Sequence, residues 1–283
     1  MGLYNNEFIR IIMVRHLISA LIAKFFRIVT LLILLCSCEQ IIEVSLKDEA
    51  SKVVIESFIS NQQHPIMVKV TQSQAFFNQS DFQPVEKASV LLETSSLTDK
   101  LEDKGGGYYV SSKSKGVSGR TYSLKITTSG KLFGATVTVP VAIPIDTVYF
   151  QPGIFRKDSL NVFIEFRDQA LNANYYRIRL YRNGRYAVND YYLITDAFSD
   201  GVKIVAPVYY HYFAPKDTVE VELQNLERNT WRYLKGISES VQQGVNSQAP
   251  GNPPSNITGG ALGVFGAYGS SSRIVVVPQI AGK

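Results

Sequence analysis

The chain has 283 residues, of which 45% are hydrophobic and 19% charged, so it can bury a core and is not disordered as a whole. Its net charge of +5 comes largely from the first 37 residues, which carry four basic residues and one acidic residue. The other 246 residues hold 25 basic and 23 acidic residues, a net charge of +2. The part of the chain after residue 37 is therefore not strongly basic, and we expect no nucleic-acid partner.

The first feature in chain order is a lipoprotein signal peptide, predicted at residues 1–37. A basic stretch precedes an uncharged apolar run at residues 28–35. Leu35 stands three residues before Cys38, and the small residue Ser37 stands directly before it, which is the spacing that a lipoprotein signal requires. The sequence therefore predicts cleavage before Cys38 and acylation of that cysteine, with palmitate among the acyl chains.

An uncleaved membrane anchor over residues 8–35 is the alternative to a cleaved leader. The apolar run is shorter than the roughly 20 residues that cross a bilayer as a helix. Charged or titratable side chains would also interrupt such a helix at a high cost. They are Arg10, Arg15, His16, Lys24 and Arg27. We therefore expect a cleaved leader, with Met1 or Met13 as the start.

Cleavage and acylation would leave no free thiol in the mature chain. Cys36 is removed with the leader and Cys38 carries lipid, and the sequence has no other cysteine. Cysteine catalysis, thiolate metal sites and disulfides are therefore not expected.

The polar, acidic residues 38–51 predict a tether, and residues 52–140 predict a β-sandwich domain of the immunoglobulin or transthyretin kind. Short segments alternate apolar and polar residues and end at turn residues, as is typical of sandwiches. Ser129-Gly130 indicates a hairpin turn. The expected strands are Val53–Ile59, Ile66–Val70, Ser89–Thr94, Tyr122–Thr127 and Leu132–Val139.

Pro140 marks a domain boundary, and residues 141–283 predict a second β-rich domain, so that the whole chain is expected to be mainly β. Asn183-Gly184 is the strongest hairpin signal in the chain. One amphipathic helix is expected at about residues 225–242, where apolar residues recur at helical spacing. The strands expected here are Thr147–Phe150, Leu160–Phe166, Tyr175–Tyr181, Val202–Tyr212, Val219–Leu223 and Ile274–Val277.

No residues form a recognisable catalytic pattern, and we expect the protein not to be an enzyme. His64 and His211 lack a second ligand at metal spacing, so that neither a metal nor a cofactor is expected. Glu220 and Glu222 share one face of an expected strand, and paired acids could cleave a glycosidic bond. Acids at this spacing more often line the wet face of a half-buried strand, which is the interpretation we favour.

An aromatic stretch is the main candidate for contact with a ligand or partner. Alternation puts Tyr210 and Tyr212 on one face of a strand, and Tyr209, His211 and Phe213 on the other. One face must pack on the core, while the other could stack on sugar rings or cover a protein partner. Because sheets favour tyrosine on either face, a structural role is the stronger hypothesis.

Three segments resemble the lipoprotein family known as domain of unknown function 4249. The first is the opening after Cys38, IIEVSLKDEASKVVIESFIS, and the second is QPVEKASVLL, which begins at Gln83. The third and most specific joins Trp231 on the expected helix to Asn256 and a glycine-rich run that continues through Phe265 to Tyr268. We expect structural roles for the glycines of this run, where backbones turn or approach closely. They are Gly259, Gly260, Gly263 and Gly266.

The resemblance implies an outer-membrane lipoprotein that works beside a TonB-dependent receptor in nutrient capture or uptake, and it implies no catalytic residues. The alternative is a freestanding surface module that binds glycans or mediates adhesion. In both hypotheses the lipid holds the protein to the membrane. The sequence leaves open whether that face is periplasmic or on the cell surface, and whether the ligand is a small molecule or a glycan.

Overall fold

The computed structural model describes residues 15, 18–19, 21–27, 51–74, 82–153, 160–187, 192–242 and 251–279. Residues 1–48 form one unit and residues 49–283 form another, compact unit. The predicted lipidation site, Cys38, and nearly all of the tether at residues 38–51 lie outside the described residues. No helix in the described ranges combines the length and the apolar character needed to cross a bilayer.

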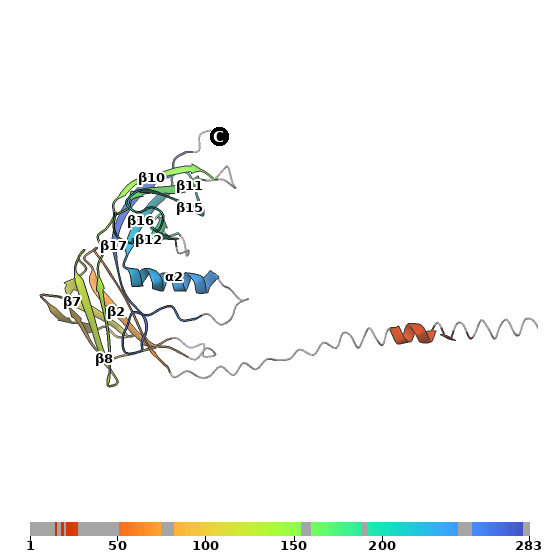
Figure 1. The fold of residues 1–283 in the computed structure, drawn as a ribbon, viewed down its shortest axis with the longest axis horizontal. Helices are drawn as coiled ribbons and strands as arrows, with labels where there is room; N and C mark the ends of the chain where they lie inside the picture. Colours follow the sequence, from red (N-terminus) through yellow and green to blue (C-terminus); the bar gives the residue numbers. More distant parts are fainter. Residues whose placement is uncertain are drawn as a thin grey trace, which may run out of the picture. The chain divides into compact units, whose positions relative to one another are not determined.

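The described part of the second unit is mainly β, as the sequence predicted, and its strands form three sheets (Figure 1). The largest sheet contains β1 (Val53–Ser60), β2 (Pro65–Gln72), β3 (Gln83–Pro84), β6 (Glu102–Asp103), β7 (Tyr108–Lys115), β12 (Tyr175–Arg182), β13 (Arg185–Tyr186), β14 (Tyr192–Thr195), β16 (Thr218–Leu226) and β17 (Leu262–Val276). Its order is β13-β12-β16-β17-β1-β2-β7-β6, with β14 on β12 and β3 on β2.

Two smaller sheets and one helix complete this unit. The four-stranded sheet has the order β5-β4-β8-β9, and the three-stranded sheet has the order β10-β11-β15. The bounds of these elements are β4 (Ser89–Glu93), β5 (Thr98–Lys100), β8 (Thr121–Thr128), β9 (Lys131–Thr138), β10 (Ile145–Pro152), β11 (Leu160–Arg167), β15 (Lys203–Phe213) and helix α2 (Arg228–Gln242).

Both hairpins predicted from two-residue turn signals are confirmed. Ser129 and Gly130 join β8 to β9 with φ angles of 48° and 72°. Asn183 and Gly184 join β12 to β13 with φ angles of 49° and 75°. Two positive φ angles in a two-residue loop give the turn that matches the twist of a hairpin, which is why asparagine and glycine predict it.

The 15-residue strand β17 lies in the middle of the large sheet and joins its two halves. From Leu262 to Tyr268 it pairs in parallel with β1, and from Tyr268 to Val276 it pairs antiparallel with β16. The sequence predicted a strand only from Ile274. The earlier part of β17 was not recognised as a strand because it is rich in glycine, which has little intrinsic strand propensity.

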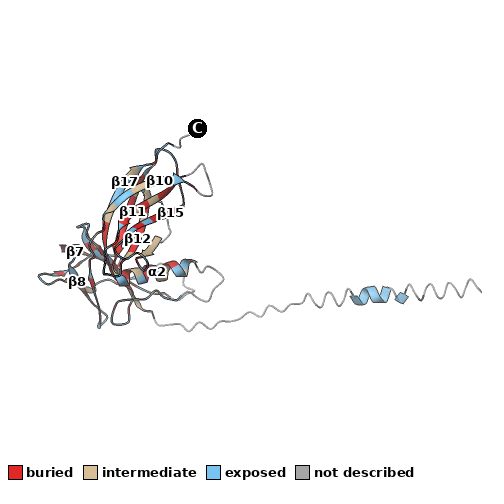
Figure 2. Ribbon diagram, turned by 45° about the horizontal axis from the view of Figure 1, so that its top comes forward, coloured by how far each residue is buried: buried red, intermediate tan, exposed pale blue. Residues whose placement is uncertain are grey.

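Each smaller sheet packs on the large sheet and closes a separate hydrophobic core. The four-stranded sheet packs on β1, β2 and β7, and the three-stranded sheet packs on β12 and β16. Buried residues make up much of β11 and β12 (Figure 2). The first core also contains Ile257, Phe265 and Ala267 from the C-terminal part of the chain. The boundary predicted at residue 140 therefore does not divide the packing, because the last strand returns to complete the first core.

Helix α2 lies on the opposite face of β17 from the first core (Figure 1). Val264 and Tyr268 of β17 pack in the helix cluster, whereas Phe265 and Ala267 pack in the first core. Successive residues of a strand point to opposite faces, so the helix covers the face that the smaller sheets leave free. Trp231 belongs to this helix cluster.

The start of α2 is fixed by hydrogen bonds rather than by its apolar spacing. The carboxylate of Glu227 accepts bonds from the backbone N–H groups of Asn229, at 2.8 Å, and Thr230, at 3.1 Å. A carboxylate at this position caps the helix and stabilises its positive end. The backbone N–H of Ala267 donates to Thr230 Oγ1 at 2.9 Å, which ties the first turn to β17. The helix thus begins three residues after the predicted start at residue 225.

Candidate functional site

A pocket of about 320 Å³ lies between α2 and the face of the large sheet that the smaller sheets leave free. This volume is at the lower end of the range for small-molecule sites. Its walls combine charged, aromatic and aliphatic side chains, which is the usual composition of a ligand pocket. The lining side chains that matter here are Arg177 and Arg179 of β12, Glu56 and Phe58 of β1, and Tyr233 and Ile237 of α2.

Glu222 of β16 supports the arginine end of this pocket. Its side chain is buried, and two donors serve each of its oxygens. Oε1 accepts bonds from Ser270 Oγ at 2.7 Å and Gln224 Nε2 at 2.9 Å. Oε2 accepts bonds from Tyr181 OH at 3.1 Å and Arg179 Nη1 at 3.4 Å. These four donors compensate the carboxylate for its lost water and fix the position of Arg179.

The burial of Glu222 corrects the sequence interpretation. Glu220 and Glu222 were expected to line a wet face together, but Glu222 is 5% exposed. Hydrogen-bonding side chains from β12 and β17 cover it, and strand alternation alone cannot reveal them because they come from distant parts of the chain.

Two tyrosine rings position the guanidinium group of Arg179. The ring centroids of Tyr186 and Tyr181 lie 4.7 and 5.2 Å from its Cζ. Cations over tyrosine rings are attracted by the ring quadrupole. The Nε atom of Arg179 is buried and has no hydrogen-bond partner among the described residues. Burial and the charge of Glu222 raise the pKa of Tyr181 to about 12, so that this tyrosine stays a protonated donor at neutral pH.

The other end of the pocket carries a carboxylate. Tyr233 OH of α2 donates to Glu56 Oε1 of β1 at 3.1 Å. Phe58, also on β1, is 40% exposed and offers an apolar surface beside it. A Cβ at Gly266 would lie 2.8 Å from Phe58 Cδ1 and 2.8 Å from Thr230 Oγ1. The missing side chain at Gly266 therefore makes room for Phe58 and the first turn of α2.

The segment that resembles the family contributes structure to this region. Asn256 Nδ2 donates to the carbonyl oxygen of Phe265 at 2.8 Å, and the Phe265 N–H donates to Asn256 Oδ1 at 3.0 Å. This amide side chain takes the place of a paired strand. Trp231 packs against the ring of Tyr175, with centroids 4.8 Å apart, and Lys235 Nζ lies 5.0 Å from its ring.

The glycines of the same segment allow close contact between backbones. Gly263 has a φ of 94°, and a Cβ there would lie 2.1 Å from the carbonyl oxygen of Ile55. A Cβ at Gly259 would lie 2.4 Å from the carbonyl oxygen of Leu132. Gly260 also has a positive φ, of 83°, but no atom lies within 4 Å of its Cβ position. Gly263 and Gly259 are thus required for packing, and Gly260 for its backbone angle.

The aromatic stretch predicted to contact a ligand or partner lies in β15. Phe213 is a buried member of the second core, so it is a packing residue and not a contact residue. The side chains of Tyr209, Tyr210, His211 and Tyr212 lie outside the described residues, and their contact role stays a prediction.

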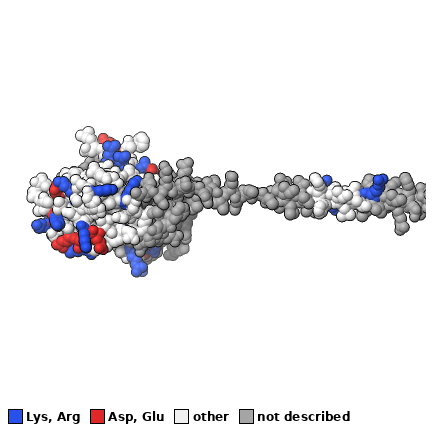
Figure 3. Space-filling view, turned by 90° about the horizontal axis from the view of Figure 1, so that it is seen from below, with Lys and Arg blue, Asp and Glu red and all other residues white. Residues whose placement is uncertain are grey.

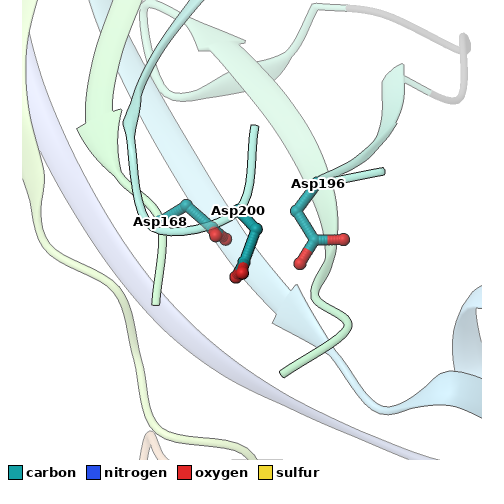
Figure 4. A group of neighbouring side chains, drawn as sticks. All are labelled: Asp168, Asp196 and Asp200. Atoms are coloured by element: carbon teal, nitrogen blue, oxygen red, sulfur yellow. The ribbon is translucent and has the colours of Figure 1, made fainter. Parts of the chain in front are cut away.

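Three carboxylates that the sequence did not point to, Asp168, Asp196 and Asp200, lie close together (Figure 4). One oxygen from each lies within 4.8 Å of the others, and Asp168 and Asp196 are buried. Carboxylate oxygens are ligands that calcium prefers. Backbone N–H groups nevertheless account for their positions by closing the loops that carry them. The donors are Gly201 to Asp168 at 2.8 Å, Asn174 to Asp196 at 2.8 Å and Leu171 to Asp200 at 2.9 Å.

Charges of both signs are interspersed on the face of the molecule seen in Figure 3. This agrees with the near balance of basic and acidic residues after the leader.

The chain matches a known protein family over most of its length. The model of the family described as Domain of unknown function (DUF4249) matches residues 39–274. No curated protein matches the chain. The matched region includes the first core, the second core up to residue 274, α2 and all residues that line the pocket.

Proposed function

The chain belongs to the DUF4249 family, and from this premise we propose that it is an outer-membrane lipoprotein that captures a ligand for a TonB-dependent receptor. The family match begins at residue 39, directly after Cys38. If a leader that ends at residue 37 is cleaved off, the family match would be expected to begin close to Cys38, as it does. The observation that carries the capture function is the pocket between α2 and the large sheet.

The chemistry of the pocket favours binding over catalysis. Its buried carboxylate, Glu222, already accepts hydrogen bonds from four protein donors. Tyr181, with its pKa raised to about 12, is a poor source of protons at neutral pH. Fixed donors and aromatic walls are what a binding site needs to orient a ligand.

The receptor part of the proposal has two supports, the resemblance of the sequence and the predicted lipid at Cys38. A lipid anchor would keep the protein in the plane of the membrane that holds the receptor. Two-dimensional confinement raises the effective concentration of the two partners.

Affinity purification from solubilised membranes tests this proposal. A tag at the C-terminal end of the chain should recover a TonB-dependent receptor together with the protein. The matched control is Cys38→Ala, which should leave the protein outside the membrane fraction and recover less receptor. A protein that stays in the membrane but recovers no such receptor would contradict the proposal. Glycan binding by that protein would then favour a freestanding adhesion module.

A further inference from the structure

The charges along the pocket indicate the chemistry of its ligand. Arg177 and Arg179 stand two residues apart on β12, so both guanidinium groups extend from the same face of the sheet. Glu56 stands on β1, with β16 and β17 between it and the two arginines. The pocket thus has a cationic end and an anionic end.

The apolar surface of the pocket comes from both of its walls. Phe58 contributes a partly exposed ring from β1, and Ile237 and Leu234 contribute aliphatic side chains from α2. An apolar group that displaces water from this surface would bind favourably, at about 25 cal/mol for each Å² buried.

The guanidinium group of Arg179 is held in an orientation that suits the binding of an anion. Glu222 accepts from only one of its nitrogen atoms, at 3.4 Å, whereas a guanidinium group has five N–H donors in a planar fork. The rings of Tyr181 and Tyr186 hold this fork in place. Arginine pairs with carboxylates through two parallel hydrogen bonds, and a fixed fork loses less entropy when it does so.

We propose that this pocket binds a monocarboxylate with an apolar body, its carboxylate at Arg177 and Arg179 and its apolar part against Phe58 and Ile237. The inference rests on the proposed capture function and specifies its ligand class. Glu56 at the far end repels a second carboxylate, so the pocket discriminates against dicarboxylates. Such a carboxylate could belong to a free organic acid or to the C-terminal end of a short peptide.

Calorimetric titration of the purified, detergent-solubilised protein tests the ligand class without any receptor. The probes are 3-phenylpropanoate and the dipeptide Ala-Phe, each compared with the amide of the same carboxyl group, and phenylsuccinate as the dicarboxylate. Trp231, the only tryptophan of the chain, lies on α2 and gives a second readout by fluorescence. Receptor recovery is a separate measurement, so that either proposal can fail alone.

At least one of the two carboxylate probes should bind, and its amide should bind at least tenfold more weakly. Phenylsuccinate should bind more weakly than 3-phenylpropanoate if the site takes free acids. Binding of Ala-Phe alone assigns the site to peptide ends, and binding of 3-phenylpropanoate alone assigns it to free acids. Equal affinity for acid and amide, or no binding of either acid at millimolar concentration, would overturn the proposal.

Substitutions at two positions of one strand separate charge recognition from loss of fold. Arg177→Gln should weaken carboxylate binding at least tenfold, and Arg177→Lys should recover part of it. Arg182→Gln changes an arginine on the same strand that pairs with Asp217 outside the pocket, and it should leave binding unchanged. Thermal melts check that all three variants are folded. A folded Arg177→Gln variant with unchanged affinity would contradict the proposal.

Discussion

Individual buried polar residues of this protein are held by donors that replace water. Asp99 on β5 is 1% exposed, and its Oδ2 accepts bonds from the backbone N–H groups of Lys113, at 3.0 Å, and Ser114, at 2.7 Å. Both donors belong to β7, so this one carboxylate links the four-stranded sheet to the large sheet. Burial acts to raise the pKa of Asp99, but the hydrogen bonds from Lys113 and Ser114 outweigh it and lower the pKa below its usual 3.8.

The lowered pKa of Asp99 predicts how stability depends on pH. A carboxyl group with a lower pKa in the folded state stabilises the fold above pH 3.8 and loses that effect as the pH falls through the folded value. Asp99→Asn should lower the free energy of unfolding by about 1–3 kcal/mol at pH 7. Urea titrations should show this difference shrinking below pH 3.8. A difference that stays constant down to pH 2 would argue against the role of Asp99.

Glu222 provides a second test at this scale. Glu222→Ala removes the acceptor for Arg179 and leaves a half-buried cation without its carboxylate, which should cost about 3–5 kcal/mol of unfolding free energy. Glu222→Gln keeps the shape and one acceptor oxygen, and it should cost clearly less. Chemical denaturation of both variants measures the difference, and equal stabilities would show that the network contributes little.

Among the secondary-structure elements, β17 depends most on its glycines. Gly263→Ala would place a Cβ 2.1 Å from the Ile55 carbonyl oxygen and should destabilise the protein by more than about 3 kcal/mol. Gly260→Ala is the matched control, since its φ is also positive but the space around it is open. Gly260→Ala should lower the free energy of unfolding by only about 1–2 kcal/mol, which is the cost of placing alanine in a left-handed conformation. Equal losses in thermal or urea unfolding would contradict the close contact between β1 and β17.

Elements whose sequence signals lie between neighbouring residues could be predicted, whereas elements that depend on distant residues could not. Alternation found β1, β8 and β12, and the turn residues found both hairpins, because these signals act between neighbours in the chain. The start of β17 depends on Asn256 and on pairing with β1, which lies about two hundred residues earlier in the chain. The pocket likewise combines residues of β1, β12, β17 and α2. These elements are far apart in the chain, so local sequence patterns could not predict that their side chains line one pocket.

At the scale of the whole molecule, β17 couples the two hydrophobic cores. Its residues pack in the first core and pair with β16 of the second. We therefore expect the body at residues 49–283 to unfold in one cooperative transition, because loss of β17 would open both cores. Scanning calorimetry should give equal calorimetric and van't Hoff enthalpies. Two separated transitions would show that residues 52–140 form an independent domain.

The proposed function depends on the predicted attachment of this body to a membrane. The pocket could capture a ligand in any compartment, but the proposed delivery to a TonB-dependent receptor relies on the predicted lipid anchor at Cys38. Mass spectrometry of the N-terminal peptide from the protein purified out of its own membrane is the most direct test. We predict a chain that begins at Cys38 and carries acyl groups on that residue. A chain that keeps residues 1–37, or that has an unmodified thiol at Cys38, would contradict the account.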